Sequence, residues 1–242
     1  MNEKIGEFDN RVVVIIGAAG GLGSVVSQQF SERGAKIVLV GRDAEKLEAL
    51  GATLNISRGR WMPVEADLTN EESVQRLSSK VMSTFGHVDI LINLVGGWIG
   101  GISLNEVKPE QVDLMINQHI WSTFFAAQAF VPLLVENKWG RVIVVSSPNA
   151  ENPPPNGLPY SVAKAGQESL ILTLAAELRG SGVTANILRV KTIDVNHEKE
   201  NNPSSKNSSW TTPEEITNAI FFLCSDDARV VNGARIPLYG SP

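Results

Sequence analysis

Short runs of β-branched residues alternate with longer segments of helical periodicity along the whole chain, and this alternation is the strongest constraint on the fold. Val12–Ile16 is a continuous apolar run, as expected for a strand that is buried on both faces of a sheet. Strands joined through helices form a parallel sheet with helices on both faces. The sequence therefore predicts an α/β protein with a three-layer, doubly wound Rossmann fold around a central parallel β-sheet.

The expected elements fill the chain without a repeat or a linker, which predicts a single dinucleotide-binding domain over residues 1–242. The expected strands are Val12–Ile16, Lys36–Val40, Arg60–Glu65, Val88–Val95, Arg141–Ser146, Val183–Val190 and Ala234–Leu238. The expected helices are Leu22–Arg33, Asp43–Leu50, Glu71–Phe85, Pro109–Asn137 with a possible break near Gln118, Tyr160–Leu178 and Pro213–Cys224.

A glycine-rich turn lies directly after the first expected strand and opens the first expected helix. Small residues at this place let the backbone turn sharply and approach a pyrophosphate closely. The N-terminus of the helix also offers unpaired N–H groups and a positive dipole end to the phosphates. The turn therefore predicts a dinucleotide site formed by Gly17, Ala19, Gly21, Leu22 and Gly23.

The end of the second expected strand, Val40-Gly41-Arg42, bears on the choice of cofactor. An acidic side chain there would bind the adenosine ribose hydroxyls of NAD. Gly41 instead leaves room, and the planar guanidinium of Arg42 suits a phosphate. We therefore expect NADP(H) in preference to NAD(H). The alternative is that Arg42 is a solvated residue in front of a helix.

Tyr160 and Lys164 lie one helical turn apart on one face of an expected helix. A neighbouring ammonium group lowers the pKa of a phenol, which makes Tyr160 a candidate general acid for carbonyl reduction or base for alcohol oxidation. Ser147 directly follows an expected strand, at the carboxyl edge of the sheet where open α/β folds bind ligands. The three residues predict a catalytic group.

The glycine-rich turn, Ser147 and the run Tyr160–Lys164 together resemble the short-chain dehydrogenase/reductase family, from about Arg11 to Gly240. The resemblance implies an NADP(H)-dependent oxidoreductase that transfers a hydride between the nicotinamide and a small carbonyl or alcohol substrate. It implies that Ser147 binds the substrate carbonyl oxygen and that Tyr160 delivers its proton. Lys164 would bind the nicotinamide ribose and tune Tyr160.

The resemblance also implies further cofactor contacts. Asp67 and Leu68 follow the third expected strand, where an acidic residue of the family approaches the adenine, although Asp67 could equally cap the next helix. Asn93 and Gly96 would keep the turn beside the cofactor, and Ile193 lies in the region that holds the nicotinamide amide.

The sequence departs from the family at three places, the first being Asn93-Leu94-Val95-Gly96, where the family has Asn-Asn-Ala-Gly. His119 stands where the family has a catalytic Asn that holds a water linking the Lys to solvent. An imidazole could hold such a water, shuttle protons itself, or merely pack there. Val190-Lys191 replaces the Pro-Gly turn expected after the sixth strand. These departures motivate an alternative function, a dinucleotide-binding redox sensor or scaffold with little turnover.

Residues 196–209 form a polar segment that is either a disordered surface loop or a mobile substrate lid. Trp98 and Ile99 could line the other wall of the pocket, although an exposed loop tryptophan would also fit. The aromatic residues of the long helix indicate a core or a subunit interface, and the family commonly forms homodimers or homotetramers in this region. They are Trp121, Phe124, Phe125 and Phe130.

Composition excludes several other partners. Among 242 residues, 21 Lys and Arg against 26 Asp and Glu give a net charge of −5, which argues against extended nucleic-acid or anionic-membrane surfaces. The single cysteine, Cys224, excludes an internal disulfide and is expected to fill the core. His87 and His197 have no ligand-like neighbours in the sequence, so no metal site is expected. The charged start MNEKIGEFDNR lacks the apolar core of a signal peptide, so a cytoplasmic location is expected.

Overall fold

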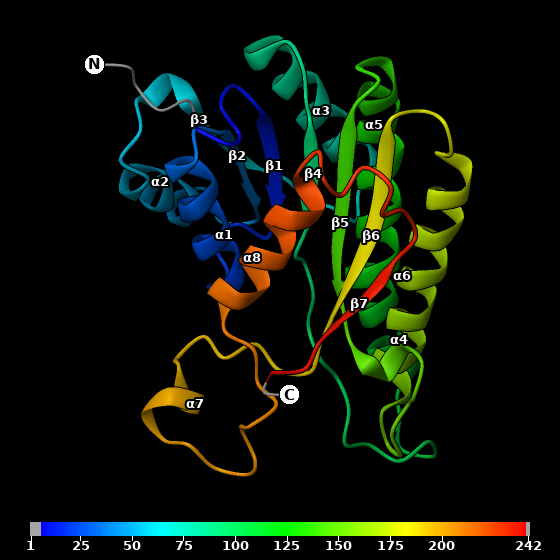
Figure 1. Ribbon diagram of the computed structural model, residues 1–242. Helices are drawn as coiled ribbons and strands as arrows, with labels where there is room; N and C mark the ends of the chain where they lie inside the picture. The colour runs from blue at the N-terminus through cyan, green and yellow to red at the C-terminus, as the bar shows by residue number, and fades with distance from the viewer. Residues whose placement is uncertain (1–5, 241–242) are drawn as a thin grey trace.

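The computed structural model describes residues 6–240, which contain a seven-stranded parallel sheet in the order β3-β2-β1-β4-β5-β6-β7 (Figure 1). The predicted doubly wound Rossmann fold is confirmed. The direction of winding reverses between β1 and β4, and such a switch point is where open α/β sheets bind ligands. The strands are β1 Val12–Ile16, β2 Lys36–Gly41, β3 Trp61–Glu65, β4 Ile90–Asn93, β5 Gly140–Ser146, β6 Val183–Val190 and β7 Arg235–Leu238.

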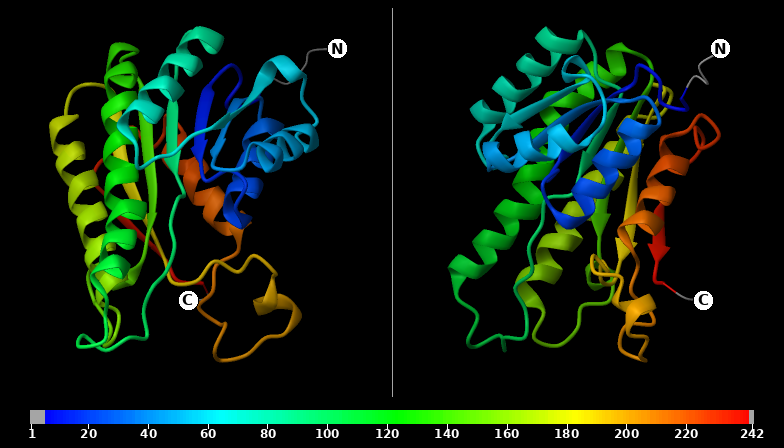
Figure 2. Two further views of the ribbon diagram at one scale, coloured as in Figure 1. Left: turned by 180° about the vertical axis from the view of Figure 1, so that it is seen from behind. Right: turned by 90° about the vertical axis from the view of Figure 1, so that its left-hand side faces the viewer.

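Two layers of helices cover the two faces of the sheet (Figure 2). One face carries α1 Gly21–Glu32, α2 Ala44–Thr53 and α8 Pro213–Cys224. The other face carries α3 Glu71–Phe85, α4 Pro109–Ile116, α5 Ser122–Glu136 and α6 Leu158–Glu177.

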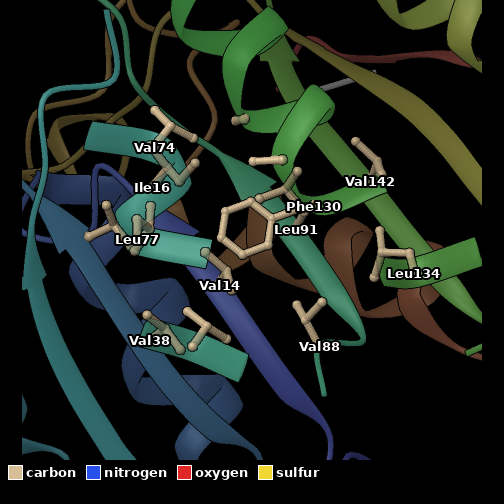
Figure 3. Close-up of a cluster of buried hydrophobic side chains, with 14 of the residues drawn as sticks. Val14, Ile16, Val38, Val74, Leu77, Val88, Leu91, Phe130, Leu134 and Val142 are labelled. Atoms are coloured by element: carbon tan, nitrogen blue, oxygen red, sulfur yellow. The ribbon is translucent and has the colours of Figure 1, made fainter. Parts of the chain in front are cut away.

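Each face of the sheet has its own hydrophobic core, because side chains alternate between the faces along each strand. Val12, Val14 and Ile16 enter one core, while Val13 and Ile15 enter the other. Figure 3 shows the first core, in which Phe130 of α5 lies against Leu91 of β4. The free Cys224 is buried in the second core, so its expected role as a core residue is confirmed.

Local capping explains where two helices begin. The Asn70 side chain accepts a hydrogen bond from Ser73 N at 2.8 Å and caps α3. The Asp67 carboxylate instead accepts hydrogen bonds from the N–H and the hydroxyl of Thr69, so the interpretation of Asp67 as a helix cap is wrong. Thr212 and Glu215 form a reciprocal capping box at the start of α8.

The long helix expected over Pro109–Asn137 is interrupted, as predicted, near Gln118. A five-residue π-helical segment, Asn117–Trp121, separates α4 from α5. Short π segments inside α-helices frequently occur at functional sites, because the extra residue displaces side chains from their regular helical positions. Here the displaced segment carries His119.

Residues 196–209, predicted as either a disordered loop or a mobile lid, contain several side-chain hydrogen bonds. They contain the short helix α7, Glu198–Asn201, and extend away from the sheet (Figure 1). The buried Asp194 carboxylate accepts from Glu198 N and Lys199 N, each at 2.8 Å. The Asn207 amide closes the segment by donating to the carbonyl oxygens of Glu198 and Asn202.

Within residues 6–240, no helix combines the length and the apolar character needed to cross a membrane. The same part of the chain contains no group of three or more His, Cys, Asp or Glu side chains suited to a metal ion. His87 lies beside Asp89, and His197 contacts Glu214 at 3.0 Å.

Candidate active site

A cavity of about 640 Å³ opens at the carboxyl edge of the sheet, next to the switch point between β1 and β4. It brings together residues from six separate stretches of the sequence. Its lining includes Gly17, Gly21, Leu22 and Gly23 of the glycine-rich turn, but not Ala19, and also Gly96, His119, Tyr160, Lys164 and Ile193. Ile193, just before the polar segment 196–209, is held there by a bridge to Thr211, just after that segment.

The glycine-rich turn has the geometry that a pyrophosphate requires. A Cβ atom on Gly23 would lie 2.2 Å from the carbonyl oxygen of Gly17, so only glycine lets α1 pack this closely on the turn. Gly17 has a φ of +84°, in the left-handed region that favours glycine. Gly20 caps α1 without a side-chain hydrogen bond, which leaves the helix N-terminus open to an anion. The residues present therefore fit a bound dinucleotide.

A second, smaller cavity of about 270 Å³ lies beyond the end of β2 and is lined in part by Arg42, Asp67 and Ser73. The Arg42 side chain is exposed. Hydrogen bonds from Thr69, and more weakly the charge of Arg42, lower the pKa of Asp67. Leu68 does not line this cavity, because its side chain is buried in the core.

The turn after β4 packs directly against His119. The Asn93 side chain accepts from Val95 N at 3.0 Å and donates to Thr123 Oγ1 at 3.0 Å, which holds the turn in place. A Cβ atom on Gly96 would lie 2.7 Å from Cε1 of His119. A side chain at position 96 would therefore clash with the imidazole ring and would also project from the lining of the cavity.

Ser147 does not itself line the cavity but is hydrogen-bonded to Tyr160, which does. Ser147 follows β5, is buried, and its hydroxyl accepts from Asn149 N at 3.3 Å. Burial raises the pKa of Tyr160, and hydrogen bonding with the Ser147 hydroxyl opposes this rise. The phenol is therefore protonated at neutral pH, as a general acid must be before it reacts.

The Lys164 ammonium group is buried beneath Tyr160. Its Nζ donates to the carbonyl oxygen of Val145 at 2.7 Å and to Gln167 Oε1 at 2.9 Å. The same Nζ lies 5.8 Å from the centre of the Tyr160 ring. Burial lowers the pKa of Lys164 from 10.5 to about 7, while the charge of Glu168 raises it.

His119 is nearly fully buried and its ring lies edge-on to that of Tyr160, with 5.5 Å between the centres. Its Nε2 is 3.0 Å from the carbonyl oxygen of Gly97, so Nε2 carries the proton and Nδ1 is an acceptor. Nδ1 has no hydrogen-bond partner among residues 6–240. Burial first, and then the charge of Lys164, lower the pKa of His119 to about 3. The imidazole is therefore neutral at neutral pH.

The structure adds residues that the sequence analysis missed. Gln167 contacts Lys164, and its spacing of one helical turn after Lys164 was a signal that could have identified it. Val195 covers the glycine-rich turn, since a Cβ atom on Gly21 would lie 2.7 Å from its Cγ2. No sequence pattern indicates that contact. Trp98 does line the cavity, although its side chain is 66% exposed.

Comparison with known proteins agrees with this geometry. A family model described as short chain dehydrogenase matches residues 11–206. The chain is 32% identical, over 96% of both chains, to the (2S)-[(R)-hydroxy(phenyl)methyl]succinyl-CoA dehydrogenase subunit BbsD of Thauera aromatica. It is 28% identical to a D-threitol dehydrogenase of Mycolicibacterium smegmatis, covering 96% of this chain and 93% of that protein. A crystal structure of a short chain dehydrogenase from Bacillus anthracis superimposes with a TM-score of 0.86 at 29% identity, covering 96% of this chain and 95% of that one.

Proposed function

Because the chain belongs to the short-chain dehydrogenase/reductase family of NAD(P)-dependent enzymes that act on CH–OH and C=O groups, we propose that it transfers a hydride between NADP(H) and a small carbonyl or alcohol substrate. The observation that carries the proposal is that Tyr160 and Lys164 line the same cavity as the glycine-rich turn, with the Ser147 hydroxyl hydrogen-bonded to Tyr160. A nicotinamide cofactor supplies or accepts the hydride when bound.

In the direction of reduction, the protein supplies a proton and electrostatic stabilisation. Ser147 Oγ donates a hydrogen bond to the carbonyl oxygen and positions it. Tyr160 Oη gives its proton to that oxygen as negative charge develops there, which leaves a phenolate. The Lys164 ammonium group stabilises the phenolate, because a nearby positive charge favours the ionised form of a phenol. In the direction of oxidation, the Tyr160 phenolate removes the proton from the alcohol.

The preference for NADP(H) is supported by the cavity beyond β2. Arg42 lines this cavity, its side chain is exposed, and its charge acts on Asp67 across it. A guanidinium group binds a phosphate through paired hydrogen bonds, whereas the ribose hydroxyls of NAD are better bound by a carboxylate. Arg42 would therefore hold the 2′-phosphate of NADP.

The position of the polar segment 196–209 supports the proposal that it covers the substrate. Val195 and Ile193, which lead into it, lie at the glycine-rich turn and in the main cavity. The segment is also tied to α8, through Lys199 with Glu215 at 3.1 Å. We infer that the whole chain acts as one dinucleotide-binding domain and that this segment, rather than a second domain, contributes to substrate specificity. The cytoplasmic location stays a prediction.

A homo-oligomer is supported by exposed aromatic side chains around α5. Trp121 is 43% exposed and Phe124 is 38% exposed, and with Phe125 they form a cluster with ring centres 5.5–5.8 Å apart. A gathered apolar surface of this kind commonly marks a protein interface. Phe130 does not belong to it, because this residue is fully buried in the core. We propose a second copy of the chain as the partner.

The proposed reaction is tested by following NADPH oxidation with a panel of small ketones and aldehydes, in the wild type and in Tyr160→Phe. We expect turnover in the wild type and a loss of about 100-fold or more in kcat in the variant, because the phenyl ring has no proton to give. NADPH binding by both proteins, without turnover on any substrate, would contradict the enzyme and favour the alternative, a redox sensor or scaffold.

A further inference from the structure

Beneath the catalytic lysine lies a buried hydrogen-bond network that the proposed chemistry does not use. Gln167 Oε1 accepts from Lys164 Nζ at 2.9 Å, and Gln167 Nε2 donates to Thr123 Oγ1 at 2.9 Å. Thr123 Oγ1 in turn donates to the carbonyl oxygen of His119 at 2.7 Å. The side chains of Lys164, Gln167 and Thr123 are all buried. The network therefore connects α6 to the π-helical segment through protein groups alone.

Thr123 is the branch point of this network. Its hydroxyl accepts from Gln167 and from Asn93 Nδ2, and it donates to His119. A hydroxyl has one proton and two lone pairs, so all its hydrogen-bonding positions are filled. The Gln167 amide is thereby held in one orientation, with its oxygen toward Lys164, because the nitrogen is committed to Thr123.

The Lys164 ammonium group has three protons, and it donates two of them in hydrogen bonds to neighbouring protein groups. Val145 O and Gln167 Oε1 accept two of them, which leaves one donor for the cavity side. Without Gln167, the flexible lysine side chain would keep one hydrogen bond among residues 6–240, to Val145 O. Gln167 and Val145 together thus determine where the remaining donor lies.

We propose that Gln167 is a positioning residue that holds the charged Lys164 side chain in place beneath Tyr160 through a direct hydrogen bond anchored by Thr123. The proposal deepens the proposed function and rests on the role assigned there to Lys164. Hydrogen bonds to the charged form of a group favour that form, so Gln167 also keeps Lys164 protonated against the cost of burial.

The other ionisable groups around Lys164 come from two elements. Tyr160 and Glu168 lie on α6 itself, and His119 lies on the π-helical segment. Glu168 is already paired with Arg189 and Arg235, which limits the charge that it offers to Lys164. His119 is neutral at neutral pH. The hydrogen bond from Lys164 Nζ to the uncharged Gln167 side chain is therefore a major stabilising contact of the ammonium group.

The test measures the pKa of Lys164 directly by NMR in protein with ¹³C-labelled lysine, without cofactor or substrate. The Lys164 signal is identified by its absence in Lys164→Met. We expect Gln167→Met, which keeps the length of the side chain but removes the acceptor, to lower this pKa by about one unit. Gln167→Glu, which places a carboxylate there, is expected to raise it by a similar amount.

The two variants also have opposite signatures in turnover. Loss of the Lys164 proton removes its stabilisation of the phenolate, so activity falls as the pH rises through the pKa of Lys164. The alkaline limb of the kcat profile should therefore move to lower pH in Gln167→Met and to higher pH in Gln167→Glu. Merely structural damage would instead lower activity in both variants without moving the limb in opposite directions.

Thr217→Val is the matched control, because it removes a buried hydroxyl of α8, away from the site, whose only hydrogen bond within residues 6–240 is to the Pro213 carbonyl. It should leave the pKa of Lys164 unchanged. An unchanged Lys164 pKa in both Gln167 variants, or a shift of the same sign in both, would overturn the proposal. Opposite shifts in a protein without carbonyl turnover would keep the positioning role and refute the proposed reaction instead.

Discussion

At the scale of single residues, burial sets the protonation states that the site starts from. It raises the pKa of Tyr160 and lowers the pKa of Lys164, so the protein by itself favours a neutral phenol and a lysine that titrates near neutrality. Tyr160 therefore holds a proton that it can give. The stability of the phenolate that is left depends on whether Lys164 remains protonated. Arg42 has the opposite environment, exposed at the edge of its cavity and free to bind an anion from solvent.

Arg42→Ala is the prediction that belongs to this scale. Loss of a charged hydrogen-bonding partner should weaken NADPH binding about tenfold or more, whereas NADH, which lacks the 2′-phosphate, should bind as before. Dissociation constants for both cofactors measure the effect. Lys46→Ala, which removes a cation of α2 that pairs with Asp43, is the control. Equal losses for NADPH and NADH in Arg42→Ala would refute the assigned preference.

At the scale of elements, the π-helical segment builds the wall of the site opposite the glycine-rich turn. Side chains one turn further on satisfy two of its carbonyl groups, with Ser122 donating to Gln118 O and Thr123 to His119 O. The segment is thereby held in its wide turn, and His119 reaches across to Gly97. The imidazole lines the cavity and is neutral, and its buried Nδ1 has no hydrogen-bond partner among residues 6–240. We propose that His119 positions a donor group or a water molecule rather than carrying protons.

The test for this segment compares pH–rate profiles of the wild type, His119→Asn and His119→Ala. A group with a pKa near 3 does not change its charge in the range where the enzyme is assayed. The limbs of the profile should therefore stay in place in both variants, while kcat falls by about tenfold in His119→Ala through the lost hydrogen bond. A limb that disappears with the imidazole would show that His119 does carry protons.

At the scale of the whole molecule, the winding of the sheet collects the site from distant parts of the chain. The carboxyl ends of β1, β4, β5 and β6 lie side by side, so the loops after them meet at one edge. The two cores fix the helices on either face and thereby place α1 and α6 at opposite sides of the cavity. Phe125 of the aromatic cluster packs against the first core, whereas Trp121 and Phe124 are partly exposed, and we propose that these two contact a second copy of the chain.

Phe124→Glu is the prediction for the assembly. A charge placed within the aromatic cluster should dissociate the homo-oligomer, because the interface would have to bury an unpaired carboxylate. Size-exclusion chromatography with light scattering measures the mass of the particle. Val230→Glu, at an apolar residue that is 82% exposed elsewhere, should leave the mass unchanged. A wild-type protein of 26.1 kDa in solution would already contradict the assembly.

The periodicity of the sequence by itself determined the fold class, nearly all the strands and helices and the break near Gln118, because buried strands and amphipathic helices have local patterns. The sequence also predicts a catalytic group of Ser147, which follows a strand end, and Tyr160 and Lys164, which lie one helical turn apart. Only the tertiary structure decided the state of His119, the contact of Val195 with Gly21 and the network of Gln167 with Thr123. These depend on burial and on contacts between elements far apart in the chain, which no local pattern specifies.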